Sequence, residues 1–243
     1  MTKFELTVLG TSSALPTSQR YPTAHVLNVH ERFFLIDCGE GTQIQLRRYK
    51  IRSSRINHIF ISHLHGDHYF GLVGLLSTYA LLGRKNDLHI YSHSELADIL
   101  KPQLDFMELE NAFRIVWHPL NFKRPAVVLD DEHITVTSFP LNHRIACCGF
   151  HFVEKPGERH IIKEKMSEYE IPLREIPLLK IGCDFVTPDG NVIANSELTR
   201  EPRKPRSYSF CTDTTFLPHV AEYIKGTDLL YHEATYDKSL AER

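Results

Sequence analysis

Several features that assign a protein to a broad class are missing from this 243-residue sequence. No run of about 18 apolar residues occurs, which argues against a membrane span. The first residues, MTKFELTVLG, lack the apolar region and cleavage site of a secretory signal. The five cysteines include no CxxC pair, so neither a disulfide framework nor a thiolate zinc finger is expected. The net charge of −2 gives no global sign of a nucleic-acid partner. Because the sequence has neither a disulfide pattern nor a secretory signal, we expect a cytoplasmic protein.

Short β-branched and aromatic runs, bounded by turn-forming residues, are frequent instead. They predict strands over residues 4–9, 25–30, 33–38, 58–62, 88–92, 113–118, 126–130, 134–139, 147–153, 207–212 and 229–234. Apolar residues at helical spacing predict helices over 41–50, 69–82, 94–106 and 216–226, with Pro102 as a possible break. Helices interleaved with strands indicate a layered α/β fold.

The pattern becomes irregular from Glu154 to Arg206, a segment rich in proline that contains ten Lys/Arg and ten Asp/Glu residues. An irregular segment of this length inside a compact domain is usually functional or disordered. We therefore expect a core made of residues 1–153 and 207–243, with 154–206 as an inserted arm. Within the arm, residues 177–182 could form a short strand.

The stretch FISHLHGDHYFGL places four ligand-type residues, His63, His65, Asp67 and His68, within six positions. Imidazole and carboxylate groups are the natural ligands of zinc. On an extended backbone His63 and His65 point the same way, and Gly66 allows a bend that turns Asp67 and His68 toward a second ion. The alternative is a polar loop in which Asp67 caps the next helix. Four such residues so close together favour metal binding.

Two further ligand-type residues lie where predicted strands end. His143 follows the strand predicted over 134–139, and Asp213 follows the one over 207–212. Taken alone, His143 would be a surface residue, and Asp213, Thr214 or Thr215 could cap the following helix. Together with the first motif, we expect His143 and Asp213 to be ligands, and the two oxygens of Asp213 could bridge two ions.

These residues, with the stretches LGTSSALPTSQR, FLIDCGEGTQIQLRR, CTDT and YHEAT, resemble the ribonuclease Z family of the metallo-β-lactamase superfamily. The resemblance implies an αββα sandwich in which His63, His65 and His143 hold one zinc and Asp67 and His68 hold another. Asp213 would lie between the two ions. It also implies that Asp67 accepts a proton and that Glu233 supports the site from outside the ligand shell. The family has a further histidine ligand beyond the position of Arg243, so at least one zinc is expected here and two in a complete subunit.

The implied activity is that of a zinc-dependent endoribonuclease, which removes the 3′ trailer of a tRNA precursor and leaves a 3′-hydroxyl. The resemblance also implies a homodimer and a flexible arm that grips the tRNA as an exosite. Two basic clusters could contact phosphates or simply be solvated: Arg47, Arg48, Lys50, Arg52 and Arg55, and Arg200, Arg203, Lys204 and Arg206. Two alternatives stay open: a small-molecule phosphodiesterase or other hydrolase of the same fold, and a non-catalytic module that binds RNA or a partner.

Overall fold

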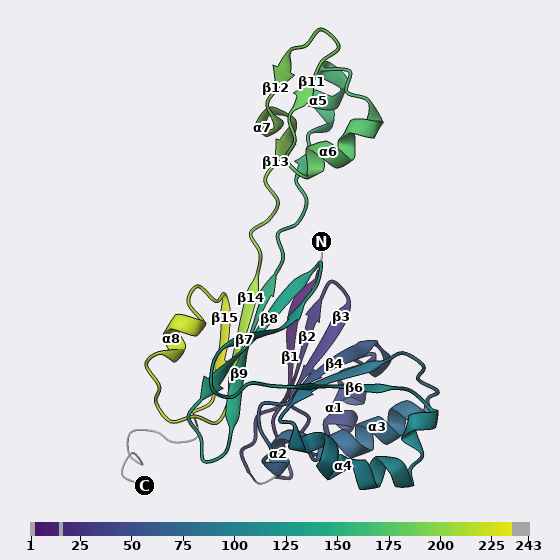
Figure 1. Cartoon of the computed structure of the whole chain (residues 1–243), viewed down its shortest axis with the longest axis vertical. Helices are drawn as coiled ribbons and strands as arrows, with labels where there is room; N and C mark the ends of the chain where they lie inside the picture. Colours follow the sequence, from purple (N-terminus) through teal and green to yellow (C-terminus); the bar gives the residue numbers. More distant parts are fainter. Residues whose placement is uncertain (1–2, 15–16, 235–243) are drawn as a thin grey trace. The chain divides into compact units, whose positions relative to one another are not determined.

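The computed structural model, which describes residues 3–14 and 17–234, divides the chain into two compact units (Figure 1). The larger unit consists of Met1–Val153 and Arg206–Arg243, and the smaller of Glu154–Pro205. The predicted layered α/β fold is confirmed, because the larger unit contains two sheets with helices beside them.

The first sheet of the larger unit has six strands in the order of the sequence. They are β1 (Phe4–Gly10), β2 (Ala24–Val29), β3 (Arg32–Ile36), β4 (Ile56–Phe60), β5 (Leu88–Ser92) and β6 (Ile115–Pro119). The first three strands pair antiparallel, and β3 to β6 pair parallel. The carboxyl ends of the parallel strands therefore meet at one edge of this sheet.

The second sheet has five strands in the order β15, β14, β9, β8 and β7. Their bounds are β7 (Ala126–Asp130), β8 (Ile134–Leu141), β9 (Cys147–Glu154), β14 (Ser207–Cys211) and β15 (Leu229–His232). β9 and β14 pair antiparallel, with Val153 opposite Ser207. The two strand ends that lead into and out of the smaller unit are thus direct neighbours.

Helices α1 (Thr42–Arg48), α3 (Gly71–Leu81) and α4 (Glu95–Phe106) lie beside the first sheet, and α8 (Val220–Tyr223) lies beside the second (Figure 1). Short pieces are α2 (Gly66–Tyr69), η1 (Ser53–Arg55) and η2 (Leu109–Asn111). Pro102 does not break α4, because Leu96 and Leu100 are buried in the core and hold the helix in place. Pro102 has no N–H to donate to the carbonyl of Asp98, but Asp98 is exposed, so water can bond that carbonyl instead. α8 is much shorter than the helix predicted over 216–226.

The core has two layers, one on each face of the first sheet. Val26 packs in the cluster under the helices, whereas the next residue, Leu27, packs in the cluster between the sheets. The same division separates Leu35 from Phe34 on β3. A strand that is buried on both faces needs apolar residues at consecutive positions, which explains the unbroken apolar runs of these segments.

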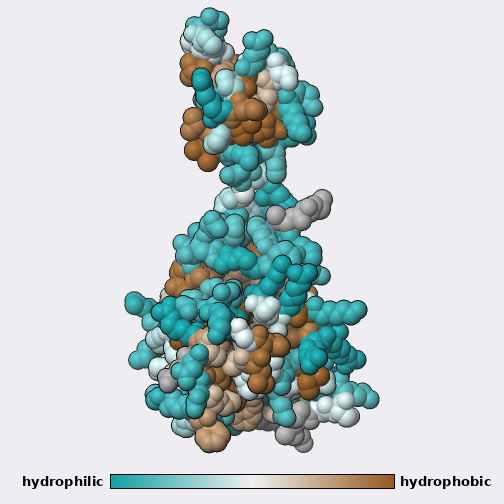
Figure 2. Space-filling view, turned by 90° about the vertical axis from the view of Figure 1, so that its right-hand side faces the viewer, coloured by the Kyte–Doolittle hydropathy of each residue, from teal (hydrophilic) through white to brown (hydrophobic). Residues whose placement is uncertain are grey.

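The smaller unit is built from short elements around its own core of Ile171, Leu179, Phe185, Ile193 and Leu198. The elements are β10 (His160–Ile161), α5 (Lys163–Glu168), η3 (Leu173–Glu175), α6 (Ile176–Lys180), β11 (Phe185–Val186), β12 (Val192–Ile193), α7 (Asn195–Leu198) and β13 (Thr199–Arg200). The strand considered over 177–182 is wrong, because Pro177 occupies the first turn of helix α6. Several large apolar side chains of this unit, including Leu173 and Ile181, are exposed (Figure 2).

Candidate metal centre

The ends of three strands bring the predicted ligands together. His63 lies three residues beyond β4, His143 two residues beyond β8, and Asp213 two residues beyond β14. One of these strands belongs to the first sheet and two belong to the second. Side chains far apart in the sequence therefore meet at the edge of the sandwich, where loops rather than packed helices follow the strands.

A close approach of two backbones fixes the loop that carries His65, Asp67 and His68. The backbone N–H of Cys38 donates to the carbonyl of His68 at 2.8 Å, and Gly71 N–H donates to the carbonyl of Cys38 at 2.9 Å. A Cβ atom on Gly71 would lie only 2.1 Å from the carbonyl oxygen of Gly39. A glycine is required here for steric reasons, since any side chain would push the loop away from the end of β3.

Three imidazoles and one carboxylate converge on a single point. His65 Nδ1 lies 3.1 Å from both His63 Nε2 and His143 Nε2. Asp213 Oδ2 lies 3.8 Å from each of those Nε2 atoms. A tetrahedral zinc ion with bonds of about 2.0–2.1 Å holds its ligand atoms roughly 3.3 Å apart, so this group fits such an ion. The donor set, a His/Asp cluster, is typical of a metallo-β-lactamase metal site.

A second group of donors adjoins the first through the same aspartate. His68 Nε2 is buried and makes no hydrogen bond with a described residue, yet it lies 3.4 Å from Asp67 Oδ2 and 3.6 Å from Asp213 Oδ1. The two oxygens of Asp213 therefore face different groups, as a bridging carboxylate does. A buried imidazole nitrogen without a hydrogen-bond partner, beside two carboxylate oxygens, is a position suited to a cation.

The electrostatic surroundings of the two groups differ. Burial, assisted by the neighbouring histidines, lowers the pKa of His63 to about 2, so this ring is neutral, as metal ligation requires. Burial also tends to lower the pKa of His68, but the carboxylates of Asp37 and Asp67 outweigh it and raise that pKa to about 10. The negative charges that stabilise a second proton on His68 would equally stabilise a metal ion at Nε2.

Asp67 points into the site and caps no helix. Its Oδ2 atom accepts a hydrogen bond from the backbone N–H of Ala14 at 2.8 Å, which ties the loop after β1 to the centre. Burial opposes ionisation of this carboxyl group, but the positive charge of the nearby His68 ring and the hydrogen bond from Ala14 lower its pKa to about 2. A carboxylate with so low a pKa is a weak base, which suits a metal ligand better than a proton acceptor. The capping alternatives for residues 213–215 also fail, because α8 begins only at Val220.

Asp37 is a part of the site that the sequence motif did not indicate. This residue is completely buried and has a φ of 55°, in the left-handed region. Its carboxylate accepts hydrogen bonds from Ser62 N at 2.8 Å, Ser62 Oγ at 2.9 Å and His68 Nδ1 at 2.7 Å. It thus orients His68 from behind, as a carboxylate behind a metal-binding histidine commonly does. The available signal was an acidic residue directly after the apolar run of β3.

The two groups open into a cavity of about 950 Å³. Its lining includes Phe70, Arg144 and Glu233 beside the candidate ligands. Glu233 lies at the rim, where its Oε1 accepts a long hydrogen bond of 3.5 Å from the backbone N–H of Thr214. The structure therefore places Glu233 next to the residue that follows Asp213, outside the two groups of donors.

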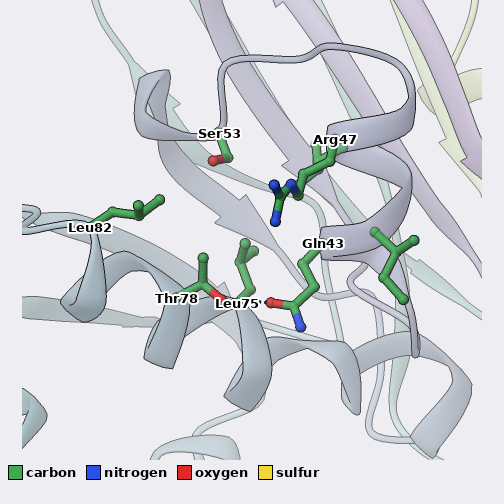
Figure 3. A pocket seen from close by; sticks show the side chains of 8 residues that line it. Gln43, Arg47, Ser53, Leu75, Thr78 and Leu82 are labelled. Atoms are coloured by element: carbon green, nitrogen blue, oxygen red, sulfur yellow. Dashed lines mark hydrogen bonds between the residues drawn. The ribbon is translucent and has the colours of Figure 1, made fainter.

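The basic residues of the first predicted RNA-contact cluster differ in their surroundings. Arg47 lies at a hollow between α1 and α3 that Gln43 and Leu82 also line (Figure 3). Arg48 lines a different hollow, together with Arg20. Arg55 forms an ion pair with Glu31 at 2.9 Å, whereas Lys50 and Arg52 are exposed.

The basic residues around the end of the smaller unit are also partly engaged. Arg203 lies 3.6 Å from the buried Glu154, and the guanidinium of Arg206 lies 5.0 Å from the centre of the Phe4 ring. Lys204 has an interaction partner as well, whereas Arg200 is exposed on β13. RNA contact by any of these residues stays a prediction.

Two packed sheets, outer helices and a His/Asp cluster at the sheet edge define a metallo-β-lactamase fold with its metal site. Crystal structures agree: the short form of human tRNase Z (ELAC1) has a TM-score of 0.71 at 28% identity, covering 98% of this chain and 80% of that one. The Bacillus subtilis metallo-β-lactamase fold protein YhfI has a TM-score of 0.57 at 16% identity, covering 93% and 68%.

Sequence comparison identifies the family. The ribonuclease Z of Bacteroides fragilis (strain YCH46) is 49% identical over 239 residues, covering 98% of this chain and 79% of that protein. That of Bacteroides thetaiotaomicron is 50% identical over 236 residues, covering 97% and 75%. The family model of the anti-Pycsar protein Apyc1 also matches residues 4–146. The chain belongs to the ribonuclease Z family, which suggests a metal-dependent hydrolase.

Within 3–14 and 17–234, no helix is both long enough and apolar enough to cross a bilayer.

Proposed function

We propose that this protein is a zinc-dependent endoribonuclease that removes the 3′ trailer from tRNA precursors and leaves a 3′-hydroxyl. The convergence of His63, His65, His143 and Asp213 on one point, in a chain of the ribonuclease Z family, carries this proposal. The chemical class of the donor set supports zinc, because imidazole nitrogen and carboxylate oxygen suit that ion. A cytoplasmic location and a homodimeric assembly are part of the proposal by analogy with the family.

The residues that line the cavity would have distinct roles in metal binding and proton transfer. His63, His65 and His143 would hold one ion, Asp67 and His68 another, and Asp213 would bridge them. Bound zinc supplies Lewis acidity to the scissile phosphate and to the attacking water. Asp67 would receive the proton of that water, and its low pKa would limit its strength as a base. Glu233, at the rim, would hold the backbone of Thr214 and so the loop that carries Asp213.

The smaller unit, residues 154–206 in our expectation, would act as an exosite for tRNA. Contacts far from the scissile bond stabilise substrate and transition state alike, so they lower KM without changing the chemical step. The exposed basic side chains, such as Arg200, would contribute contacts to phosphates that weaken as salt increases. In the larger unit, Lys50 and Arg52 are exposed in the same way and could contact RNA.

A second candidate is a hydrolase for a smaller phosphodiester on the same scaffold. The observation that favours it is that a family model, that of the anti-Pycsar protein Apyc1, matches residues 4–146, which include His63, His65, Asp67, His68 and His143 but none of the smaller unit. That match stops before the smaller unit, so the two candidates differ in whether residues 154–206 matter for turnover.

The test compares two substrates in the full-length protein, with and without the smaller unit. Because Val153 and Ser207 are paired neighbours on β9 and β14, a short Gly/Ser turn can replace residues 154–206 without moving either strand. We expect KM for precursor tRNA to rise and kcat/KM to fall, while hydrolysis of bis(p-nitrophenyl) phosphate persists. Equal losses on both substrates would show that the arm supports the fold instead. Failure of the intact protein to cleave precursor tRNA would leave the smaller-substrate hydrolase as the better proposal.

A further inference from the structure

A chain of buried hydrogen bonds lies behind the candidate metal centre and connects its two groups. Asp37 Oδ2 is bonded to His68 Nδ1 at 2.7 Å and to Ser62 Oγ at 2.9 Å. Ser62 Oγ is in turn 3.0 Å from His63 Nδ1. All four residues are completely buried. His68 belongs to one group of donors and His63 to the other, so the chain joins the two groups from the side opposite the cavity.

The direction of each hydrogen bond follows from counting hydrogens. The Asp37 carboxylate only accepts, and Ser62 Oγ has a single hydrogen, which it donates to Asp37. Towards His63, Ser62 Oγ can therefore only accept, so the donor must be the Nδ1–H of His63. His68 likewise donates from Nδ1 to Asp37. In both rings the proton is held on Nδ1, and the lone pair of Nε2 faces the candidate metal position.

Another neighbour could in principle hold the ring of His63. Cys147 Sγ lies 3.7 Å from His63 Nδ1, but sulfur is a weak acceptor at a longer distance than Ser62 Oγ. Ser62 is therefore the group that determines the proton position on His63.

We propose that Ser62 is a positioning residue that passes the constraint set by Asp37 on to His63, so that one buried carboxylate fixes the Nδ1–H form of one histidine in each metal group. This inference deepens the proposed function and rests on its metal centre. The two groups would then share both Asp213 and the hydrogen bonds from Asp37 that keep the proton of one histidine in each group on Nδ1. A change at Asp37 should disturb both groups, whereas loss of the Ser62 hydroxyl should disturb mainly the group of His63.

The two variants differ in a way that a general loss of packing would not reproduce. Ser62→Ala removes the acceptor for His63 but leaves the direct bond between His68 and Asp37. In Asp37→Asn, the backbone N–H of Ser62 still requires the amide oxygen, so the amide NH₂ faces Ser62 Oγ and His68. That NH₂ donates to His68 Nδ1 and to Ser62 Oγ, so Ser62 in turn donates its hydroxyl hydrogen to His63 Nδ1. Both rings would then carry their proton on Nε2, where the metal should bind.

The first measurement needs no variant. Long-range ¹H–¹⁵N spectra of the full-length protein, selectively labelled at histidine and loaded with zinc, report which nitrogen of each ring carries hydrogen. His63→Gln and His68→Gln proteins identify the two sets of signals. We expect the proton on Nδ1 in both rings and slow exchange of the His63 proton with solvent. A His63 ring bound to zinc through Nδ1 would overturn the proposal.

The second measurement follows the same signals during zinc titration of the variants. We expect Ser62→Ala to weaken zinc binding at His63 by about 10–100-fold and to change binding at His68 by less than about threefold, as loss of a partner behind one ligand does. Ser209→Ala is the matched control, because that buried hydroxyl also bonds a histidine, His151 Nδ1, at 2.7 Å, but belongs to neither group. It should leave both affinities unchanged.

Failure of this inference can be told apart from failure of the proposed function. If the intact protein binds zinc but Ser62→Ala binds it normally at both positions and the exchange of the His63 proton is unaltered, only the role of Ser62 is wrong. If the intact protein binds no zinc, the proposed function fails as well. If Ser62→Ala does not fold, the spectra of the unmodified protein and of Asp37→Asn still decide, because Asp37→Asn must weaken zinc binding at both histidines.

Discussion

Acidification should loosen the contact between the two sheets through a single buried histidine, His25. This residue lies on β2, is completely buried, and has its ring 5.0 Å from that of Phe210 on β14 and 4.4 Å from that of Tyr231 on β15. Its Nδ1 is hydrogen-bonded to Tyr208 Oη at 2.8 Å. β14 leads directly to Asp213, so the packing of His25 supports the strand that delivers the bridging carboxylate.

The magnitude follows from the pKa of His25, which burial lowers from 6.5 to about 3 in the folded protein. Between these values the unfolded chain binds a proton that the folded chain does not, so the free energy of unfolding falls as the pH falls. No loss is expected above about pH 6.5. At 1.36 kcal/mol per pH unit, lowering the pH from 6.5 to 5 should cost about 2 kcal/mol from this residue alone.

The assay compares the unmodified protein with His25→Asn by urea denaturation at pH 7.5 and pH 5, with a chelator present. Asparagine can keep the hydrogen bond to Tyr208 but does not titrate. All other groups, including the candidate metal ligands, contribute equally to both proteins and cancel in the difference. We expect the unmodified protein to lose about 2 kcal/mol more than the variant on acidification. Equal losses in the two proteins would show that His25 is protonated in the folded state and that the argument from burial is incorrect.

Three further predictions concern the candidate site in the full-length protein. Asp213→Asn should lower the zinc content measured by elemental analysis and reduce cleavage by at least about 100-fold, whereas Asp189→Asn, an exposed change in the smaller unit, should do neither. Asp67→Ala should reduce turnover of precursor tRNA by more than roughly 100-fold while a cooperative thermal transition remains, and near-normal turnover would exclude its proposed role. Gly71→Ala should lower the free energy of unfolding in urea by about 1–3 kcal/mol, because its new Cβ would meet the Gly39 carbonyl, and an unchanged value would contradict that close approach.

Local features of the sequence were sufficient to predict the fold class and to select the residues that converge at the site. His63, His65, Asp67 and His68 are close in the chain, so their concentration is visible without a structure. The strands were equally visible, because residues buried on both faces of a sheet form unbroken apolar runs. His143 and Asp213 were found by their positions directly after strands, since residues at strand ends reach the edge of a sheet.

The tertiary structure decided which residues act together, because pairing across the chain leaves no local pattern. Asp37 and Ser62 are 25 positions apart and meet only because β3 and β4 are neighbours in the sheet. Arg47 and Arg48, adjacent in a basic cluster, line different hollows because successive residues of a helix point about 100° apart. The smaller unit was not predicted as an ordered element because its segments are too short to show a period, and Leu179 gains its buried position only when those segments pack together. Composition and spacing thus determined which chemical groups this protein has, and the long-range contacts of the folded chain determined which of them face a common centre.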